Sequence, residues 1–228
     1  MSTATPRTGR PTTRTTERPR HLSAHTFGLH GPAKRVIDVV GAGTLLILLL
    51  PLLAVLTVLV LLSGPGPALF VQTRVGRDGR PFRMFKLRTM RTGAHVEAAL
   101  LRRGRHDGSG PMFKLREDPR VTRVGRFLRR SSLDELPQLV NVLLGDMSLV
   151  GPRPALPEEV ARYSPHVRRR LQVKPGLTGP WQVSGRSRLS WQRAVALDLA
   201  YVEEATLATD LWILLRTVPA VLFGRGAY

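Results

Sequence analysis

Two adjacent carboxylates, Asp134 and Glu135, are the residues of this sequence best suited to do chemistry. They follow two arginines, Arg129 and Arg130, in a chain that has 35 Lys and Arg but only 16 Asp and Glu. Consecutive side chains on a helix point about 100° apart, so neighbouring acids can take different tasks. One could attack a phosphorus atom while the other holds a hard cation such as Mg²⁺, whose ligands are oxygens.

A purely structural interpretation of the same stretch is a helix-capping box. Ser132 would be the N-cap and Glu135 the third helical residue, and each side chain would accept a hydrogen bond from the other residue's backbone N–H. That register places Pro137 at the fifth helical position, where its ring would clash and one hydrogen bond would be lost. The capping interpretation is therefore weakened, but it stays open beside the catalytic one.

Two further segments offer anion-binding groups. Arg153 stands between Pro152 and Pro154, and this stiff backbone suits a pre-organised guanidinium that grips phosphate through two parallel hydrogen bonds. A glycine-punctuated segment over residues 174–186 holds one indole, Trp181, and ends at Arg186. Its structural alternative is a surface loop around a buried tryptophan.

Composition excludes several classes of site. There are no cysteines, which removes disulfides, zinc ribbons, iron–sulfur clusters and thiol catalysis. The sequence also has no Gly-Lys-Ser/Thr phosphate loop, no complete dinucleotide-binding glycine motif and no nucleophile-elbow serine. A formal net charge of +19 with 43% hydrophobic residues indicates a folded protein with polyanionic partners: nucleic acid, anionic lipid headgroups or phosphorylated small molecules.

One apolar run is long enough to cross a membrane. Residues 39–62 form 24 consecutive positions without a charge, and a helix rising about 1.5 Å per residue would cover a hydrocarbon core of roughly 30 Å. Two features oppose a simple crossing. Pro51 interrupts the run at its centre, and basic residues flank both ends, although the positive-inside rule places such flanks on one side. From the residues alone, a spanning helix and a re-entrant helix broken at Pro51 both stand.

The segments on either side of this run differ in character. Residues 1–30 have too few apolar side chains to offset their ordering entropy, so we expect a disordered basic tail. After the run, residues 70–90 predict a β-hairpin that turns at Asp78-Gly79. A polar, glycine-rich loop is expected over residues 102–110.

Helical patterns dominate the rest of the chain, so the predicted fold class is α+β and mostly helical. The patterns cover residues 121–130, 136–144, 158–173 with an interruption near Pro165, 191–204 and 209–223. The last of them carries Trp212 and Arg216. It is either an amphipathic helix lying at a membrane interface or an ordinary core helix.

Taken together, these segments resemble the bacterial sugar transferase family, the monotopic phosphoglycosyl transferases that start capsule, exopolysaccharide and glycoconjugate assembly. The resemblance runs in consistent order over residues 34–228 and leaves only the tail uncovered. The matching stretches are the apolar run with its central Pro51 and residues 85–90, 132–139, 141–142, 145–154, 173–179 and 182–186.

The resemblance implies a reaction and a role for each acid. Asp134 would attack the β-phosphate of a UDP-sugar, expelling UMP and forming a sugar-phosphoryl aspartate. Glu135 would hold the Mg²⁺ that bridges the diphosphate. A polyprenyl (undecaprenyl) phosphate would then accept the sugar phosphate. The ending of the chain resembles exopolysaccharide-type members, which commonly use UDP-hexoses.

Five further site residues follow from the same resemblance. Lys86, Arg129 and Arg153 would bind phosphate, and Arg186 would bind the nucleotide or its phosphates. Asp210 matches a further carboxylate near the site.

The resemblance also implies an arrangement at the cytoplasmic (inner) membrane. Residues 34–63 would form a re-entrant membrane helix broken at Pro51, and residues 64–228 a cytoplasmic catalytic domain with amphipathic interfacial helices. The chain would be a minimal catalytic form without the several-helix membrane domain of longer relatives. Two departures stand out: Leu50 precedes Pro51 where a serine is common, and Thr206 replaces a usual serine before Asp210.

Two other classes of function compete with this interpretation. A membrane-tethered nucleic-acid-binding protein would explain the charge, but aromatic residues are only 6% and no nucleic-acid motif is present, so we expect no nucleic-acid partner. A structural anchor would leave Asp134, Glu135 and the Pro-Arg-Pro run without a purpose. The sugar, the polyprenyl length and the oligomeric state, with a homodimer among the options, are not fixed by the sequence.

Overall fold

A computed structural model describes residues 31–94, 97, 115 and 118–222. The predicted tail over residues 1–30 and the predicted loop over residues 102–110 lie outside the described residues. The chain ending, 223–228, does as well. Within the described part, the architecture is mostly helical, as the sequence predicts, and it contains two small two-stranded sheets, of which one is the predicted hairpin.

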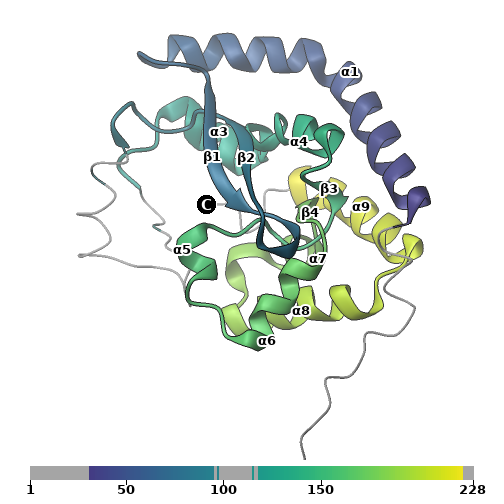
Figure 1. Cartoon of the computed structure of the whole chain (residues 1–228). Coiled ribbons are helices and arrows are strands. Elements are labelled where there is room, and N and C mark those ends of the chain that lie inside the picture. Colours follow the sequence, from purple (N-terminus) through teal and green to yellow (C-terminus); the bar gives the residue numbers. More distant parts are fainter. Residues whose placement is uncertain (1–30, 95–96, 98–114, 116–117, 223–228) are drawn as a thin grey trace, which may run out of the picture.

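Helix α1 (Pro32–Leu62) is formed by the apolar run and begins with a proline at its first turn, where a missing N–H costs nothing. It runs along the outside of the body and changes direction part of the way along (Figure 1), with Pro51 inside it. Among the described helices, α1 is the one long and apolar enough to cross a membrane, judged by length and composition. Most of its apolar side chains are exposed.

Strands β1 (Leu69–Val75) and β2 (Pro81–Leu87) form the predicted antiparallel hairpin, with Leu69 opposite Leu87. Its turn is a short 3₁₀ segment, η2 (Arg77–Gly79). Asp78 and Gly79 both have left-handed backbones, with φ of 57° and 79°, which is the conformation that an Asp-Gly turn favours.

The second sheet was not predicted. Strands β3 (Ser148–Val150) and β4 (Gly176–Thr178) pair in parallel and have three residues each, too few for an alternating pattern to appear. The glycine of β4 is required by packing, because a Cβ on Gly176 would lie 2.1 Å from the backbone nitrogen of Gly151. A glycine-punctuated stretch that reads as a loop is therefore partly a buried strand.

Most of the other helical elements match the predicted patterns. The full set is α3 (Arg123–Ser131), η3 (Leu133–Glu135), α4 (Gln138–Leu144), α5 (Pro157–Val160), α6 (Pro165–Arg168), η4 (Arg169–Gln172), α7 (Pro180–Ser184), η5 (Arg186–Arg188), α8 (Trp191–Glu204) and α9 (Leu207–Leu222). Three short ones, η3, α7 and η5, lie outside the predicted patterns. The pattern over 158–173 becomes three short helical segments, because Ser164 caps a new helix that starts at Pro165.

The body packs against α1 on both sides of its proline. Ala42, from the first half, is buried in a cluster with residues of β2, α4, β3, α8 and α9. Leu56 and Val60, from the second half, are buried against Leu87 of β2 and Leu128 of α3. In Figure 1 the hairpin descends from the end of α1 into the middle of the molecule, and α5, α6 and α8 lie at the opposite end.

Candidate active site

The two acids lie on a single turn between two helices. Helix α3 ends at Ser131, Ser132 adopts a left-handed backbone with φ of 57°, and the 3₁₀ turn η3 then carries Asp134 and Glu135. Pro137 starts α4 as its N-cap. The capping-box interpretation is wrong, because the Ser132 side chain caps neither helix. Its Oγ instead accepts a hydrogen bond of 3.3 Å from Arg186 Nη1.

Lys86 on β2 is shared by both acids. Its Nζ lies 2.6 Å from Glu135 Oε1 and 3.9 Å from Asp134 Oδ2. The side chain of Asp134 is 10% exposed and that of Glu135 is 37% exposed. The site therefore contains one buried carboxylate and one accessible carboxylate, joined by a single ammonium group.

Asn141 on α4 holds the strand that carries Lys86. This residue is fully buried. Its side-chain Nδ2 donates a hydrogen bond of 2.7 Å to the carbonyl of Arg83, and its Oδ1 accepts one of 3.0 Å from the backbone N–H of Phe85. The two bonds fasten β2 to the helix that follows the acids. The sequence marks Asn141 only as part of a matching stretch, because its task depends on a partner more than fifty positions away.

The two carboxyl groups have opposite pKa shifts. Burial raises the pKa of Asp134, and the nearby Lys86 charge opposes this only in part. Burial acts on Glu135 in the same direction, but the charge and hydrogen bond of Lys86, together with the charges of Arg153 and Arg186, outweigh it, so the pKa of Glu135 lies below its ordinary value. Glu135 is thus held as an anion, whereas the charge on Asp134 is poorly solvated.

Three predicted arginines surround this pair. Arg129 donates from Nε to Thr89 Oγ1 at 2.9 Å. Burial lowers the Arg129 pKa, and the Asp134 charge acts against that shift. Arg153 and Arg186 both help to lower the pKa of Glu135. The structure therefore brings Lys86 and the three arginines together around the acids. The phosphate-binding roles that the family resemblance implies for them stay predictions.

Backbone geometry and a buried acid position two of these arginines. Arg186 has a left-handed backbone with φ of 53°, and its Nε donates to the carbonyl of Gln182 at 3.3 Å. Arg153 Nη1 lies 3.1 Å from Glu159 Oε2. Glu159 is only 2% exposed and also accepts from the Leu156 N–H at 2.9 Å. Its part in the site was missed from sequence, where it reads as an ordinary acid in the first turn of a helix.

Asp210 lies in a different cluster. Its carboxylate accepts from Lys34 Nζ at 2.5 Å and from the Tyr201 hydroxyl at 2.6 Å. The Lys34 ammonium and the Tyr201 hydroxyl also contact the carbonyl of Val150. Asp210 thus joins the start of α1 to α8, α9 and β3. Asp134 and Glu135 instead share Lys86, so Asp210 belongs to a separate cluster.

The acids are suited to a Mg²⁺ ion that arrives with a substrate. Among the described residues there is no group of three or more His, Asp or Glu that could hold a metal ion. Mg²⁺ is usually held by one or two carboxylates together with substrate phosphates and water. The accessible Glu135, with Asp134 next to it, provides that kind of partial donor set.

The chain matches known sugar transferases over most of its length. A family model described as "Bacterial sugar transferase" matches residues 29–224. The chain is 44% identical over 200 residues to "Galactosyl transferase CpsE" of Streptococcus agalactiae, covering 87% of this chain and 44% of that protein. It is 47% identical over 204 residues to "UDP-glucose:undecaprenyl-phosphate glucose-1-phosphate transferase" of Caulobacter vibrioides, covering 86% of this chain and 72% of that protein.

A shorter relative matches nearly end to end. The chain is 42% identical over 201 residues to "Exopolysaccharide production protein ExoY" of Rhizobium meliloti, and the match covers 87% of this chain and 89% of that protein. By contrast, the chain spans less than half the length of several longer relatives, including CpsE. The similarity thus includes the whole described body with its two acids.

Proposed function

Because the chain belongs to the bacterial sugar transferase family, we propose that it transfers a sugar 1-phosphate from a UDP-sugar to undecaprenyl phosphate and releases UMP. This would be the first membrane step in making an exopolysaccharide or glycoconjugate. The printed names of relatives include a galactose and a glucose 1-phosphate transferase acting on undecaprenyl phosphate. A UDP-hexose is therefore the donor class to test first.

The contact that best supports this function is the sharing of Lys86 by Asp134 and Glu135. In the first step, an Asp134 carboxylate oxygen attacks the β-phosphorus of the UDP-sugar. A new P–O bond forms to the aspartate, the bond to the bridging oxygen breaks, and UMP leaves with that oxygen. The product is a sugar-phosphoryl aspartate. The poor solvation of the Asp134 charge favours its use as the nucleophile.

In the second step, a phosphate oxygen of undecaprenyl phosphate attacks the same phosphorus atom. The P–O bond to Asp134 breaks and the carboxylate is regenerated. The lipid then carries a diphosphate with the sugar attached. Since the aspartate is restored, each turnover consumes one UDP-sugar and one lipid phosphate and yields one UMP.

The surrounding charges match the demands of phosphoryl transfer. The protein contributes mainly positioning and electrostatic stabilisation in such reactions. Lys86, Arg129 and Arg153 would bind the diphosphate, and Arg186 would bind the nucleotide end. A Mg²⁺ ion held by Glu135 would neutralise charge on the diphosphate. While Lys86 occupies one Glu135 oxygen, the other has no hydrogen bond to a described residue.

We further propose that α1 is re-entrant and that the body lies on the cytoplasmic face of the inner membrane. The body buries Lys34, Asp38 and Ala42 before Pro51, and Leu56 and Val60 after it. A straight helix through the bilayer would leave one of these contact regions on the wrong side. Between them, apolar residues such as Ile47 and Leu48 are 74% and 68% exposed, as expected for side chains in lipid.

Helix α9 supports an interfacial position better than a core position. It buries Ile213 in the body but exposes Leu211, Trp212 and Leu215 by 60%, 48% and 64%. Arg216 lies over the Trp212 ring at 4.7 Å. An apolar face with an aromatic ring and an arginine beside it is typical of helices at a membrane surface.

The test is to incubate membranes containing the protein with undecaprenyl phosphate and a panel of UDP-sugars, and to measure released UMP. We expect release with at least one UDP-hexose, dependent on Mg²⁺ and absent in the Asp134→Asn variant. Indifference to every UDP-sugar, together with a steeply salt-dependent affinity for DNA, would favour the nucleic-acid alternative instead.

A further inference from the structure

A second basic pocket lies at the start of α1, distinct from the carboxylate pair. It has a volume of about 270 Å³. Its lining includes four basic side chains, Lys34, Arg35, Arg77 and Lys174, and one carboxylate, Asp38. The proposed transfer reaction uses none of these residues.

The carboxylate in this pocket is already engaged. Asp38 is 4% exposed and accepts from Ser148 Oγ and from the Leu149 N–H, both at 2.9 Å. Lys34 is paired with Asp210 outside the pocket lining. Asp38 is therefore the one carboxylate of the lining that faces three further basic side chains, Arg35, Arg77 and Lys174.

Those groups have little compensation from the protein. Arg35 donates to the carbonyls of Val142 and Leu143 at the end of α4, at 2.6 and 2.8 Å; these bonds fix the guanidinium without neutralising its charge. The Lys174 ammonium makes no hydrogen bond or ion pair with any residue that the structure describes. Among the residues that the structure describes, Arg77 forms an ion pair only with its exposed neighbour Asp78.

Two of these cations converge on one point beside Gly145. A Cβ on that glycine would lie 3.5 Å from Arg35 Nη2 and 3.6 Å from Lys174 Nζ. The pKa of Lys174 is lowered by burial and by the charges of Arg35 and Arg77, and the charges of Asp38 and Asp146 oppose this shift only in part. Holding like charges together in a hollow is unfavourable unless an anion offsets their repulsion.

We propose that this pocket binds a phosphate group, supplied by the headgroup of an anionic phospholipid. Phosphate offers several oxygens to an arginine and a lysine at once. The lipid source follows from position, because several apolar residues of the α1 turns that follow Arg35 are exposed: Val36 by 59%, Ile37 by 45% and Val40 by 61%. The pocket would thus lie at headgroup depth, where basic pockets bind lipid phosphates.

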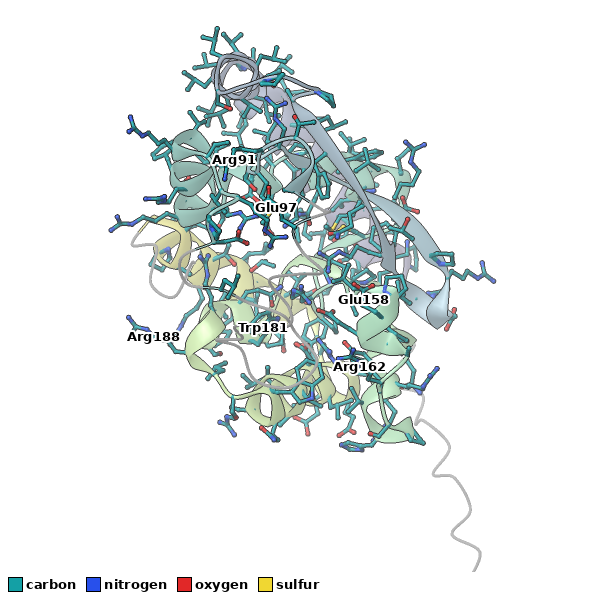
Figure 2. The ribbon with its side chains drawn as sticks, turned by 90° about the vertical axis from the view of Figure 1, so that its left-hand side faces the viewer. Arg91, Glu97, Glu158, Arg162, Trp181 and Arg188 are labelled. Atoms are coloured by element: carbon teal, nitrogen blue, oxygen red, sulfur yellow. The ribbon has the colours of Figure 1, made fainter. Side chains whose placement is uncertain are left out.

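Thermal unfolding of the full chain in lipid nanodiscs tests this proposal without measuring transfer activity. The melting temperature is measured in phosphatidylcholine alone, in phosphatidylcholine with phosphatidylglycerol, and in phosphatidylcholine with inorganic phosphate at matched ionic strength. The variants are Lys174→Gln and Arg77→Gln, which keep the Arg35 bonds to α4. The control is Arg162→Gln, an exposed arginine at the far end of the molecule from α1 (Figure 2).

We expect phosphatidylglycerol to raise the melting temperature of the wild type by several degrees. Lys174→Gln and Arg77→Gln should each lose at least half of that rise, and Arg162→Gln should keep it. A rise with inorganic phosphate that Lys174→Gln abolishes would support the phosphate pocket and assign it a soluble ligand. Equal rises in melting temperature in all four proteins would reflect general surface attraction and would overturn the proposal. The absence of any rise would overturn it as well.

Discussion

The Lys86 ammonium lies 2.6 Å from Glu135 Oε1, and this ion pair gives two neighbouring acids opposite behaviour. Glu135 gains stability from its charge, because its pKa is below the ordinary value. Asp134, with a raised pKa, costs stability when it is charged. Perturbed pKa values of this kind are common at functional sites, so the raised pKa of Asp134 agrees with the proposed role as nucleophile.

Asp134→Asn should therefore abolish transfer while raising stability. The amide removes a poorly solvated charge, so we expect an increase in melting temperature of about 2–4 °C at neutral pH, equivalent to roughly 1 kcal/mol. Glu135→Gln should also abolish transfer but lower the melting temperature. Activity above about a tenth of wild type in either variant, a barrier change under about 1.4 kcal/mol, would contradict the assigned roles.

The stability difference between Asp134→Asn and wild type should depend on pH. An acid whose pKa is raised by folding costs nothing below its unfolded pKa, about 3.9, where it is protonated in both states. The cost appears as pH rises towards and through the folded pKa. The two melting temperatures should thus converge near pH 4 and separate at higher pH. A constant separation from pH 4 to 8 would show that charge is not its cause.

A covalent intermediate should give ping-pong kinetics. UMP should leave before the lipid phosphate binds, so the protein should exchange labelled UMP into UDP-sugar with no acceptor present. Double-reciprocal plots should be parallel. Intersecting plots with no exchange would show direct transfer in a ternary complex, and Asp134 would then act as a base or metal ligand.

Glu159→Gln should weaken the site through Arg153. The buried Glu159 carboxylate fixes the guanidinium at 3.1 Å, and loss of a charged hydrogen bond in this setting costs about 1.5–3 kcal/mol. We expect a rise in KM for the UDP-sugar that Glu159→Asp partly restores. Glu203→Gln is the control, because Glu203 pairs with Arg169 at 2.6 Å but on the exposed surface, where such pairs contribute little. Equal KM values for Glu159→Gln and wild type would refute a positioning role.

Variants of Asp210 can distinguish between two roles of this residue: holding α1 against the body, which is called locking α1 below, and binding substrate. Removing one partner of a buried ion pair leaves the other charge stranded and costs about 3–5 kcal/mol, so Asp210→Leu should destabilise the protein strongly. The double variant Lys34→Met/Asp210→Leu should recover most of this loss, since apolar replacements of buried pairs are often neutral. If locking α1 is its task, activity should recover with stability. A stable but inactive double variant would instead support a role at the substrate.

Local patterns predicted much of this structure, and tertiary contacts determined the rest. The Asp-Gly turn gave the hairpin, and the pattern over 191–204 matches α8. The acid pair stood out from the residues alone, whereas the roles of its four basic neighbours come from the family resemblance and stay predictions. Three-residue strands carry no alternation, so β3 and β4 were missed. The tasks of Asn141 and Glu159 depend on where distant backbone and side chains lie, which spacing along the chain does not express.

The last prediction concerns the topology of α1. If the helix is re-entrant, single cysteines at Ser23 and Ser63 should both resist an impermeant thiol reagent in intact cells and both react once cells are permeabilised. The sequence contains no native cysteine, so the background is clean. The control in permeabilised cells matters because Ser63 is half-buried and bonded to Val60.

Pro51→Leu should shift this result partly towards a crossing helix. The change restores an N–H and removes a ring clash, so residues 39–62 could form a straight helix of roughly 36 Å, long enough to span. Straightening must also break either the Lys34–Asp210 pair or the packing of Leu56 and Val60, so the shift should be incomplete. Labelling should appear at Ser23, because the body and its basic hairpin stay inside. Clear labelling of Ser23 in wild-type cells would establish an ordinary span and refute the re-entrant helix.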